Sequence, residues 1–309
     1  MRYAQYSKEG NNVFFDYYYP TSNTIGTGFG LFNIVTQNRT GRVVTAEVNT
    51  NTVNNLTFMG NISSNVYYSD GTPVQPKEKT SNDKHHIASF EFLSVGGFAG
   101  KVLMENAQLN LKNVSFNDFY LQGARDAAGL VGHVDLSSSN GKVTITDCFS
   151  NGLKVDAGLY AAGCIEKIVN GQLVVDGFDL EFESIKNYKH KDDGWDCNGA
   201  SGIVAVVSGN NNPMTFKNIT IGDQSVPSYI GFTGDGTQYG NNNVETIMAG
   251  GFIGDTRSKS PIVIENCTAY NLNVYGHRAA AFVGHILPGA NTSLTIYNCH
   301  VYNTLGDPQ

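Results

Sequence analysis

Three carboxylates lie within one short stretch of this chain, at Asp192, Asp193 and Asp196, and the only tryptophan, Trp195, stands among them. Calcium binds several carboxylate oxygens at once, so this stretch could form a calcium site. The ring of Trp195 could also stack on a sugar beside the same carboxylates. The alternative is a solvated acidic loop whose tryptophan packs back against the fold. The residues by themselves leave these interpretations open.

Two arginines are further candidates for ligand binding, because each stands shortly before a glycine-rich strand. They are Arg125 and Arg278, and on stacked repeats they could share a face with the acidic stretch. The alternative is that both are ordinary solvated loop charges. His133 and His285 follow equivalent glycines and could also lie on one face. Their wide separation in sequence favours surface positions over a metal site.

The elements that must position these residues form a repeat. A glycine-flanked apolar run returns at intervals of about 30 residues, which is too short for an independently folded domain and typical of a solenoid. Its clear copies are residues 96–100, 128–132, 162–165, 201–204, 250–254 and 280–284, with a looser copy at 28–32. Each unit must stack on its neighbours to bury its apolar side chains.

A second signature follows each glycine-flanked run. In one copy Ile262 and Ile264 precede Asn266, while Cys267 and Ala269 follow it, so the inward phase jumps by one residue at Asn266. A corner between two strands produces such a jump. The equivalent pivots are all Asn, Asp or Gly, which tolerate a left-handed backbone, and we expect them to stack in a ladder. They are Asn55, Asn113, Asp147, Gly177, Asn218, Asn266 and Asn298.

These signatures predict an all-β fold, a right-handed parallel β-helix with three short strands per coil of about 30 residues. The predicted strands are the glycine-flanked run, the strand before the pivot and the strand after it. We expect one domain over residues 1–309, in which residues 1–24 could form an N-terminal cap. Three polar loop excursions interrupt the repeat, at residues 63–94, 186–200 and 222–248.

The pivots also account for most of the cysteines. Cys148, Cys267 and Cys299 each follow a pivot directly, so we predict that they are buried, reduced and close together on successive coils. The odd total of five cysteines gives no disulfide framework and no zinc spacing. The glycosylation-like pattern that begins at Asn266 follows from the corner geometry, and it is not evidence of glycosylation.

The composition excludes some classes of partner. Only 15% of the residues are charged and the net charge is −7, so the chain lacks the basic surface that binds nucleic acid. No apolar run reaches the length of about 18 residues that a membrane-spanning helix needs, so we expect no membrane insertion.

The pairing of G-G-F-x-G at residues 250–254 with I-E-N-C at residues 264–267 resembles the glycine-rich repeats of GLUG-type and related β-helix proteins. Those repeats occur in secreted and surface-attached bacterial proteins, including adhesins. The resemblance implies an extracellular or cell-surface location, a non-enzymatic adhesin-like role, and a host glycan or surface protein as partner. It implies no cofactor and carries over no functional residue.

A second resemblance concerns the string D-D-G-W-D at residues 192–196. It is similar to a string in a family of β-helical, pectin-lyase-like pectate lyases, where its aspartates contribute to a calcium site. The resemblance implies the alternative of a calcium-dependent polysaccharide lyase, or a glycoside hydrolase, that uses residues 186–200. The aspartate and lysine that complete the family's site on other coils have no recognisable counterpart here. A phage tailspike-like trimer is a third interpretation.

We predict that calcium raises the melting temperature only slightly, because Lys189, His190 and Lys191 partly offset the charge of the three aspartates. Replacing Asp192, Asp193 and Asp196 together by Asn should abolish the shift and leave the unfolding transition in place. Differential scanning calorimetry with calcium and with a chelator measures both. A large shift would instead favour the lyase alternative.

Overall fold

The computed structural model of the chain describes residues 4–9, 12–18, 28–29, 31–36, 49–67, 94–103, 107–123, 126–136, 141–187, 199–209, 213–231, 248–287, 292–303 and 305–308. All the secondary structure in these residues is β, arranged in three sheets. No helix among them could cross a membrane.

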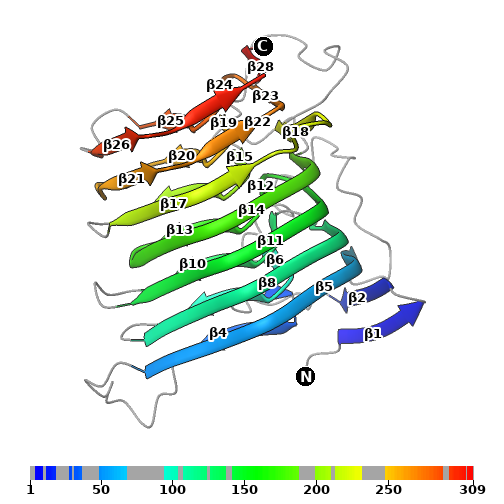
Figure 1. The fold of residues 1–309 in the computed structure, drawn as a ribbon. Helices are drawn as coiled ribbons and strands as arrows, with labels where there is room; N and C mark the ends of the chain where they lie inside the picture. Colours follow the sequence, from blue (N-terminus) through cyan, green and yellow to red (C-terminus); the bar gives the residue numbers. More distant parts are fainter. Residues whose placement is uncertain are drawn as a thin grey trace, which may run out of the picture.

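Sheet A is the largest of the three (Figure 1). Its main path runs through β1 (Ala4–Glu9), β2 (Asn12–Tyr18), β5 (Asn49–Tyr67), β8 (Ala107–Gln122), β11 (Lys142–Ala157), β14 (Gln172–Asn187), β17 (Met214–Ile221), β21 (Ile262–Glu265) and β26 (Leu294–Tyr297). Beside this path lie β18 (Ser228–Gly231), β22 (Thr268–Tyr270), β23 (Leu272–Gly276), β27 (His300–Tyr302) and β28 (Leu305–Pro308).

Sheets B and C supply the other walls of the coil. Sheet B contains β3 (Gly28–Phe29), β6 (Ser94–Gly96), β9 (Asp126–Ala128), β12 (Tyr160–Ala162), β15 (Gly199–Ser201), β19 (Met248–Gly250) and β24 (Arg278–Ala280). Sheet C contains β4 (Phe32–Thr36), β7 (Ala99–Leu103), β10 (Val131–Asp135), β13 (Ile165–Val169), β16 (Val204–Ser208), β20 (Ile253–Thr256) and β25 (Val283–Ile286).

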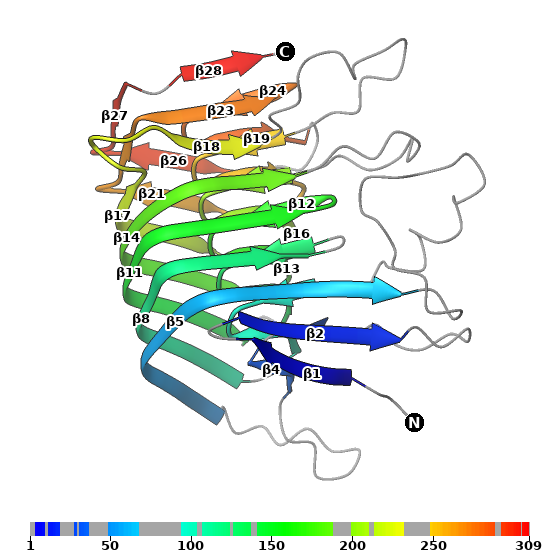
Figure 2. The same ribbon diagram turned by 90° about the vertical axis from the view of Figure 1, so that its right-hand side faces the viewer.

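The predicted fold is confirmed: the chain forms a right-handed parallel β-helix with three strands per coil. Strands equivalent in sequence lie above one another along the axis, as Figure 2 shows. Among the described strands only β1 and β2 pair in antiparallel fashion. This hairpin joins sheet A through parallel pairing of β2 with the second half of β5.

The three strands are distributed along the sequence differently from the prediction. Each glycine-flanked run contains the turn between sheets B and C, so it contributes to two strands. The pivot, conversely, bends one continuous sheet A strand in β5, β8, β11, β14 and β17. Pairing continues across the bend, with Thr146 opposite Asp176 before the pivot and Cys148 opposite Phe178 after it. A single left-handed residue turns the strand without breaking the ladder between coils.

All seven predicted pivots have the left-handed backbone, with φ between 51° and 72°. The amide ladder is confirmed at both ends of the β-helix. Nδ2 of Asn113 donates to Oδ1 of Asn55 over 3.1 Å, Nδ2 of Asn266 donates to Oδ1 of Asn218 over 3.4 Å, and Nδ2 of Asn298 donates to Oδ1 of Asn266 over 2.5 Å. Gly177 interrupts the ladder because it has no side-chain amide. Asn218 donates instead to Oδ1 of Asp176, over 2.7 Å.

A second bend follows the pivot in most coils, and the sequence pattern did not predict it. Its left-handed residues are Gly60, Asp118, Gly152, Asn271 and Asn303, with φ between 45° and 82°. The register of strand pairing shifts at this bend, between Met59 and Gly60 where β5 pairs with β8, and after Ser150 where β11 pairs with β14. This bend directs the last part of each sheet A strand toward sheet B.

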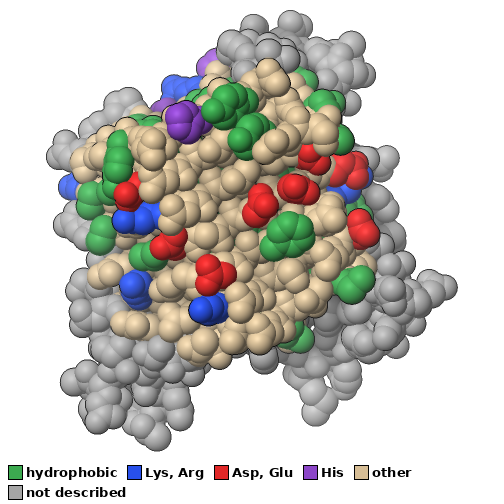
Figure 3. All heavy atoms as spheres, viewed as in Figure 1, with side chains coloured by type: hydrophobic (Ala, Val, Ile, Leu, Met, Phe, Trp, Pro, Cys, Tyr) green, Lys and Arg blue, Asp and Glu red, His purple; other side chains and the backbone are tan. Residues whose placement is uncertain are grey.

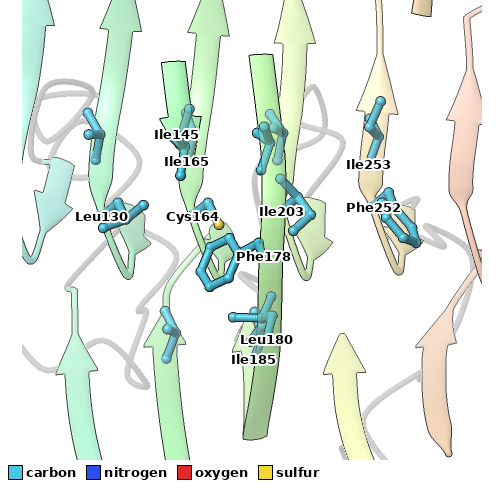
Figure 4. Close-up of a cluster of buried hydrophobic side chains, with 14 of the residues drawn as sticks. Leu130, Ile145, Cys164, Ile165, Phe178, Leu180, Ile185, Ile203, Phe252 and Ile253 are labelled. Carbon is cyan, nitrogen blue, oxygen red and sulfur yellow. The ribbon is translucent and has the colours of Figure 1, made fainter. Parts of the chain in front are cut away.

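The core is a set of stacked apolar rows inside the coils. At the turn between sheets B and C, Leu130, Cys164, Ile203 and Phe252 occupy equivalent positions on successive coils, and all are buried (Figure 4). Opposite them lie residues of sheet A such as Phe178, which is 1% exposed. Burial of these rows is the main favourable term in the stability of the fold.

The prediction for the cysteines is correct for the burial of Cys148 and Cys267 and for the proximity of Cys267 to Cys299, and wrong for the burial of Cys299 and for the proximity of Cys148 to the other two. Cys148 and Cys267 are 4% and 0% exposed, and desolvation raises their thiol pKa values to about 11 and about 12. Cys299 is only half-buried because it belongs to the last coil. The strands β14 and β17 separate Cys148 from Cys267, since Phe178 and Ile219 fill the positions between them.

Strands β5, β6, β14, β15, β18 and β19 occupy parts of the three predicted loop excursions. The rest of these excursions, apart from residues 222–227, lies outside the described residues, at 68–93, 188–198 and 232–247. Each of these connections leads from a sheet A strand to the next sheet B strand. Among the remaining long connections, 19–27 leads between the same two sheets and 37–48 leads from sheet C to sheet A.

The amide ladder predicts the effect of substitutions at Asn266. Asn266→Val should lower the free energy of unfolding by about 1–3 kcal/mol, because a β-branched residue resists φ of 54° and both ladder hydrogen bonds are lost. Asn266→Gly should cost less, since glycine adopts this backbone readily. Urea denaturation of both variants measures the difference. Equal destabilisation by Val and Gly would contradict a backbone origin.

Candidate functional site

Most of the residues predicted to bind a ligand fall outside the described part of the chain. Asp192, Asp193, Trp195 and Asp196 belong to the connection between β14 and β15, and Arg125 immediately precedes β9. The calcium site and the sugar-stacking tryptophan therefore stay predictions. Arg278 is described: it is the exposed first residue of β24.

Arg278 belongs to a row of first residues on sheet B, and a second row on sheet C faces it. The sheet B row is Ser94, Asp126, Tyr160, Gly199, Met248 and Arg278. The sheet C row is Lys101, His133, Lys167, Val206, Asp255 and His285. A Cβ atom placed on Gly199 would lie 3.3 Å from Cγ2 of Val206, which shows that the rows meet. We call these two rows the B–C seam.

The seam confirms the expectation that His133 and His285 share a face, whereas Arg125 and the acidic stretch lie outside the described residues. Arg278 and Asp126, the neighbour of Arg125, lie in the same row, although β12, β15 and β19 separate them. His133 and His285 likewise share the sheet C row, separated by β13, β16 and β20. No one ligand group can therefore contact both members of either pair directly.

At the C-terminal end of the seam a buried carboxylate holds two basic side chains. Asp255 is fully buried, and its Oδ1 lies 2.8 Å from Nδ1 of His285. Its Oδ2 accepts a hydrogen bond from Nε of Arg257 over 2.6 Å. The carboxylate thus joins β20 to the terminal strand β25, and its satisfied partners favour a structural role.

At the N-terminal end of the seam four polar side chains are buried together. Ser94, Lys101, Asp126 and Glu166 are exposed by only 1% to 8%. The hydroxyl of Ser94 donates to Oε2 of Glu166 over 3.4 Å. Burial lowers the pKa of the Lys101 ammonium group, and the charges of Glu166 and Asp126 oppose that shift. Burial thus disfavours the charged amine, while the two carboxylates next to it favour the ammonium form.

His133 lies between two lysines in the same row. Burial lowers its pKa to about 4, and repulsion by Lys167 and Lys101 adds to the shift, whereas Asp135 opposes it. The imidazole is therefore neutral at pH 7 in the folded protein.

A different kind of surface lies on the outer face of sheet A. Phe149 is 41% exposed and pairs in register with the exposed Asp179, so its ring lies beside a carboxylate. Burial raises the pKa of Glu181, and the negative charges of Asp223 and Asp179 raise it further. Asp223 accepts hydrogen bonds from the backbone and the side chain of Ser225, which lower its pKa.

We call Phe149, Asp179, Glu181 and Asp223 the acidic–aromatic patch. Figure 3 shows this face, on which separate acidic, basic and hydrophobic side chains stand among backbone and other side chains. The sequence analysis missed this patch. The available signal was an aromatic residue in an outward position, between Ser115 and Asp179 of the neighbouring strands.

The patch offers an exposed ring and several hydrogen-bond acceptors on a rigid sheet. Such a combination suits a sugar, whose apolar ring face can lie on an aromatic side chain while its hydroxyl groups donate to carboxylates. In the part of the chain that the structure describes, no cluster of His, Cys, Asp and Glu side chains could hold a metal ion.

Comparisons with protein-family models, with curated proteins and with solved structures found no match to this chain. The likeness to GLUG-type and pectin-lyase-like proteins therefore stays a prediction from the repeat, and the function must be argued from the surface itself.

The lowered pKa of His133 predicts acid-sensitive stability. The unfolded chain binds a proton at this residue near pH 6.5, whereas the folded protein does so only near pH 4. The stabilisation is complete above about pH 6.5 and is lost progressively as the pH falls toward 4. His133→Gln, which cannot take up this proton, should show a smaller fall in melting temperature between pH 7 and pH 4.5.

The matched control is His277→Gln, which removes an exposed imidazole outside the seam. Thermal unfolding followed by circular dichroism across this pH range compares the two variants with the unmodified protein. The same pH profile in all three proteins would contradict a role for His133.

Proposed function

We propose that this chain is a non-enzymatic, adhesin-like β-helix domain at a cell surface, and that it binds a neutral glycan at the acidic–aromatic patch. The observation that carries the proposal is the exposed ring of Phe149 next to the carboxylate of Asp179 on the outer face of sheet A. Partly buried carboxylates of this kind accept hydrogen bonds from sugar hydroxyl groups, and they disfavour acidic ligands by charge repulsion.

The scaffold supports a binding role. The side chains of the patch come from β11, β14 and the segment after β17, which pair with one another along the axis. Because these coils are bonded along their length, the patch is preorganised and loses little conformational entropy when a ligand binds. A regular sheet face also repeats its acceptors at the spacing between coils, which suits an extended chain of sugars.

The connections give a second line of support. Residues 68–93, 188–198 and 232–247 each connect a sheet A strand with the next sheet B strand, and segments that connect the strands of a rigid scaffold commonly carry recognition residues. Under this proposal the connection that contains Trp195 and the three aspartates adds contacts to a glycan or to a host surface protein.

The proposal predicts that Phe149→Ala lowers the affinity for a neutral oligosaccharide about tenfold, which corresponds to about 1.4 kcal/mol. Asp179→Asn should weaken binding less, because the amide keeps one acceptor oxygen. A glycan array identifies the probe, and titration calorimetry with that oligosaccharide measures the affinity. Met59→Ala is the matched control, since Met59 is a 61% exposed side chain on the same sheet, on β5.

Other results would contradict the proposed ligand, the proposed site or the proposed non-enzymatic function. No binding across neutral and acidic glycans would remove the glycan as ligand. Equal affinity of Phe149→Ala and the unmodified protein would remove the patch as the site. Unsaturated products from polygalacturonate in the presence of calcium would establish the lyase alternative, whereas a trimer in native mass spectrometry would favour the tailspike-like one.

A further inference from the structure

One position of the B–C seam departs from the repeat. Successive coils carry a small residue directly before the sheet C row, where the two sheets approach most closely. In the coils from β7 to β25 these residues are Gly100, Gly132, Ala205, Gly254 and Gly284, whereas the first coil has Asn33. The coil of β13 has Glu166 there instead, and this glutamate is 1% exposed. Because the other coils from β7 to β25 have glycine or alanine at this position, the fold does not require a glutamate there.

The side chain of Glu166 crosses the neighbouring coil to reach its partner. Gly132 lies opposite Glu166 on β10, and a Cβ atom at Gly132 would come within 2.6 Å of Cβ of Ser94. Because Gly132 has no side chain, the carboxylate of Glu166 extends through this space and accepts the hydrogen bond of Ser94 on β6. The carboxylate therefore lies among residues of the two preceding coils.

The amine of Lys101 and the carboxylate of Asp126 belong to the same buried cluster as the carboxylate of Glu166. Lys101 on β7 is 8% exposed and Asp126 on β9 is 3% exposed, and they belong to the facing rows of sheets C and B on adjacent coils. The negative charges of Glu166 and Asp126 both favour the charged form of Lys101 and so act to raise its pKa, and the charge of Glu166 has the larger effect. Glu166 is thus positioned beside the amine as a proton acceptor, with Asp126 as the second acid.

We propose that Lys101 and Asp126 form an intramolecular isopeptide bond, with Glu166 as the proton shuttle. Such a bond would fasten sheet C of one coil to sheet B of the next.

The reaction needs only groups that the cluster contains. Glu166 takes a proton from the ammonium group of Lys101, and the free Nζ attacks Cγ of Asp126. The new C–N bond forms as one C–O bond of Asp126 breaks, and Glu166 returns the proton to the leaving oxygen. That oxygen departs as water with two protons of the former ammonium group, so no oxidant, reductant or cofactor is consumed.

Burial favours this reaction over a persistent ion pair. The ammonium group of Lys101 and the carboxylate of Asp126 are both buried, and burying a charged group costs free energy. A neutral amide between them would avoid this cost for both groups. Burial also lowers the pKa of Lys101, which makes the neutral, nucleophilic amine more accessible. The amide would close a covalent loop from residue 101 to residue 126, which restricts the unfolded chain.

Mass spectrometry of the intact, full-length protein tests the bond directly. The expected mass is lower than that of the sequence by one water, and a proteolytic digest should contain one branched peptide joining Lys101 to Asp126. Asp126→Asn is the diagnostic variant. Its side-chain amide loses ammonia when Lys101 attacks, so the mass deficit should change from water to ammonia.

Two further variants separate the bond from folding. Lys101→Arg retains the charge and Glu166→Gln retains the shape, so both should fold with the same far-ultraviolet circular dichroism spectrum but show the full mass and a lower melting temperature. An intact mass without a deficit in the folded, unmodified protein would overturn the proposal. A branched peptide that joins Lys101 to Glu166 would overturn the assigned roles.

Discussion

Parallel hydrogen bonding between successive coils is the interaction on which the rest of this structure depends. Each residue pairs with its equivalent on the next coil, as Leu173 does with Val143 on one side and Met214 on the other. Pairing in register stacks like on like, so apolar rows fill the interior and asparagine amides bond in a ladder. The rings of Tyr270 and Tyr302 stack for the same reason, with centroids 5.1 Å apart.

The same constraint explains why departures from the repeat are informative. A side chain that differs from its row cannot obtain its contacts from the stack, so it must find other partners. Glu166 does so by crossing the space at Gly132 to reach Ser94. Phe149 stands outward between Ser115 and Asp179, where its ring remains 41% exposed. Features that the fold does not require are where function is expected.

The architecture also separates stability from recognition. The stacked rows and corners stabilise the rod, whereas the described parts that differ between coils lie on the outer face of sheet A and along the B–C seam. The longest connections lead mostly from sheet A to sheet B, because a solenoid accepts insertions at a corner without disturbing the pairing of its strands. This division allows surface residues to change while the coil geometry is retained.

The sequence by itself determined the solenoid, its period and all seven pivots, because apolar alternation and left-handed residue types such as Asn266 are local signals. It also gave His133 and His285 equivalent positions, and the structure places both in one row of sheet C. Only the tertiary structure decided which residues meet across coils and sheets. Ser94 and Glu166 lie far apart in sequence, and connections of unequal length separate the coils between them. Their contact depends on inter-coil register and on the close approach of sheets B and C, which packing fixes and no local pattern records.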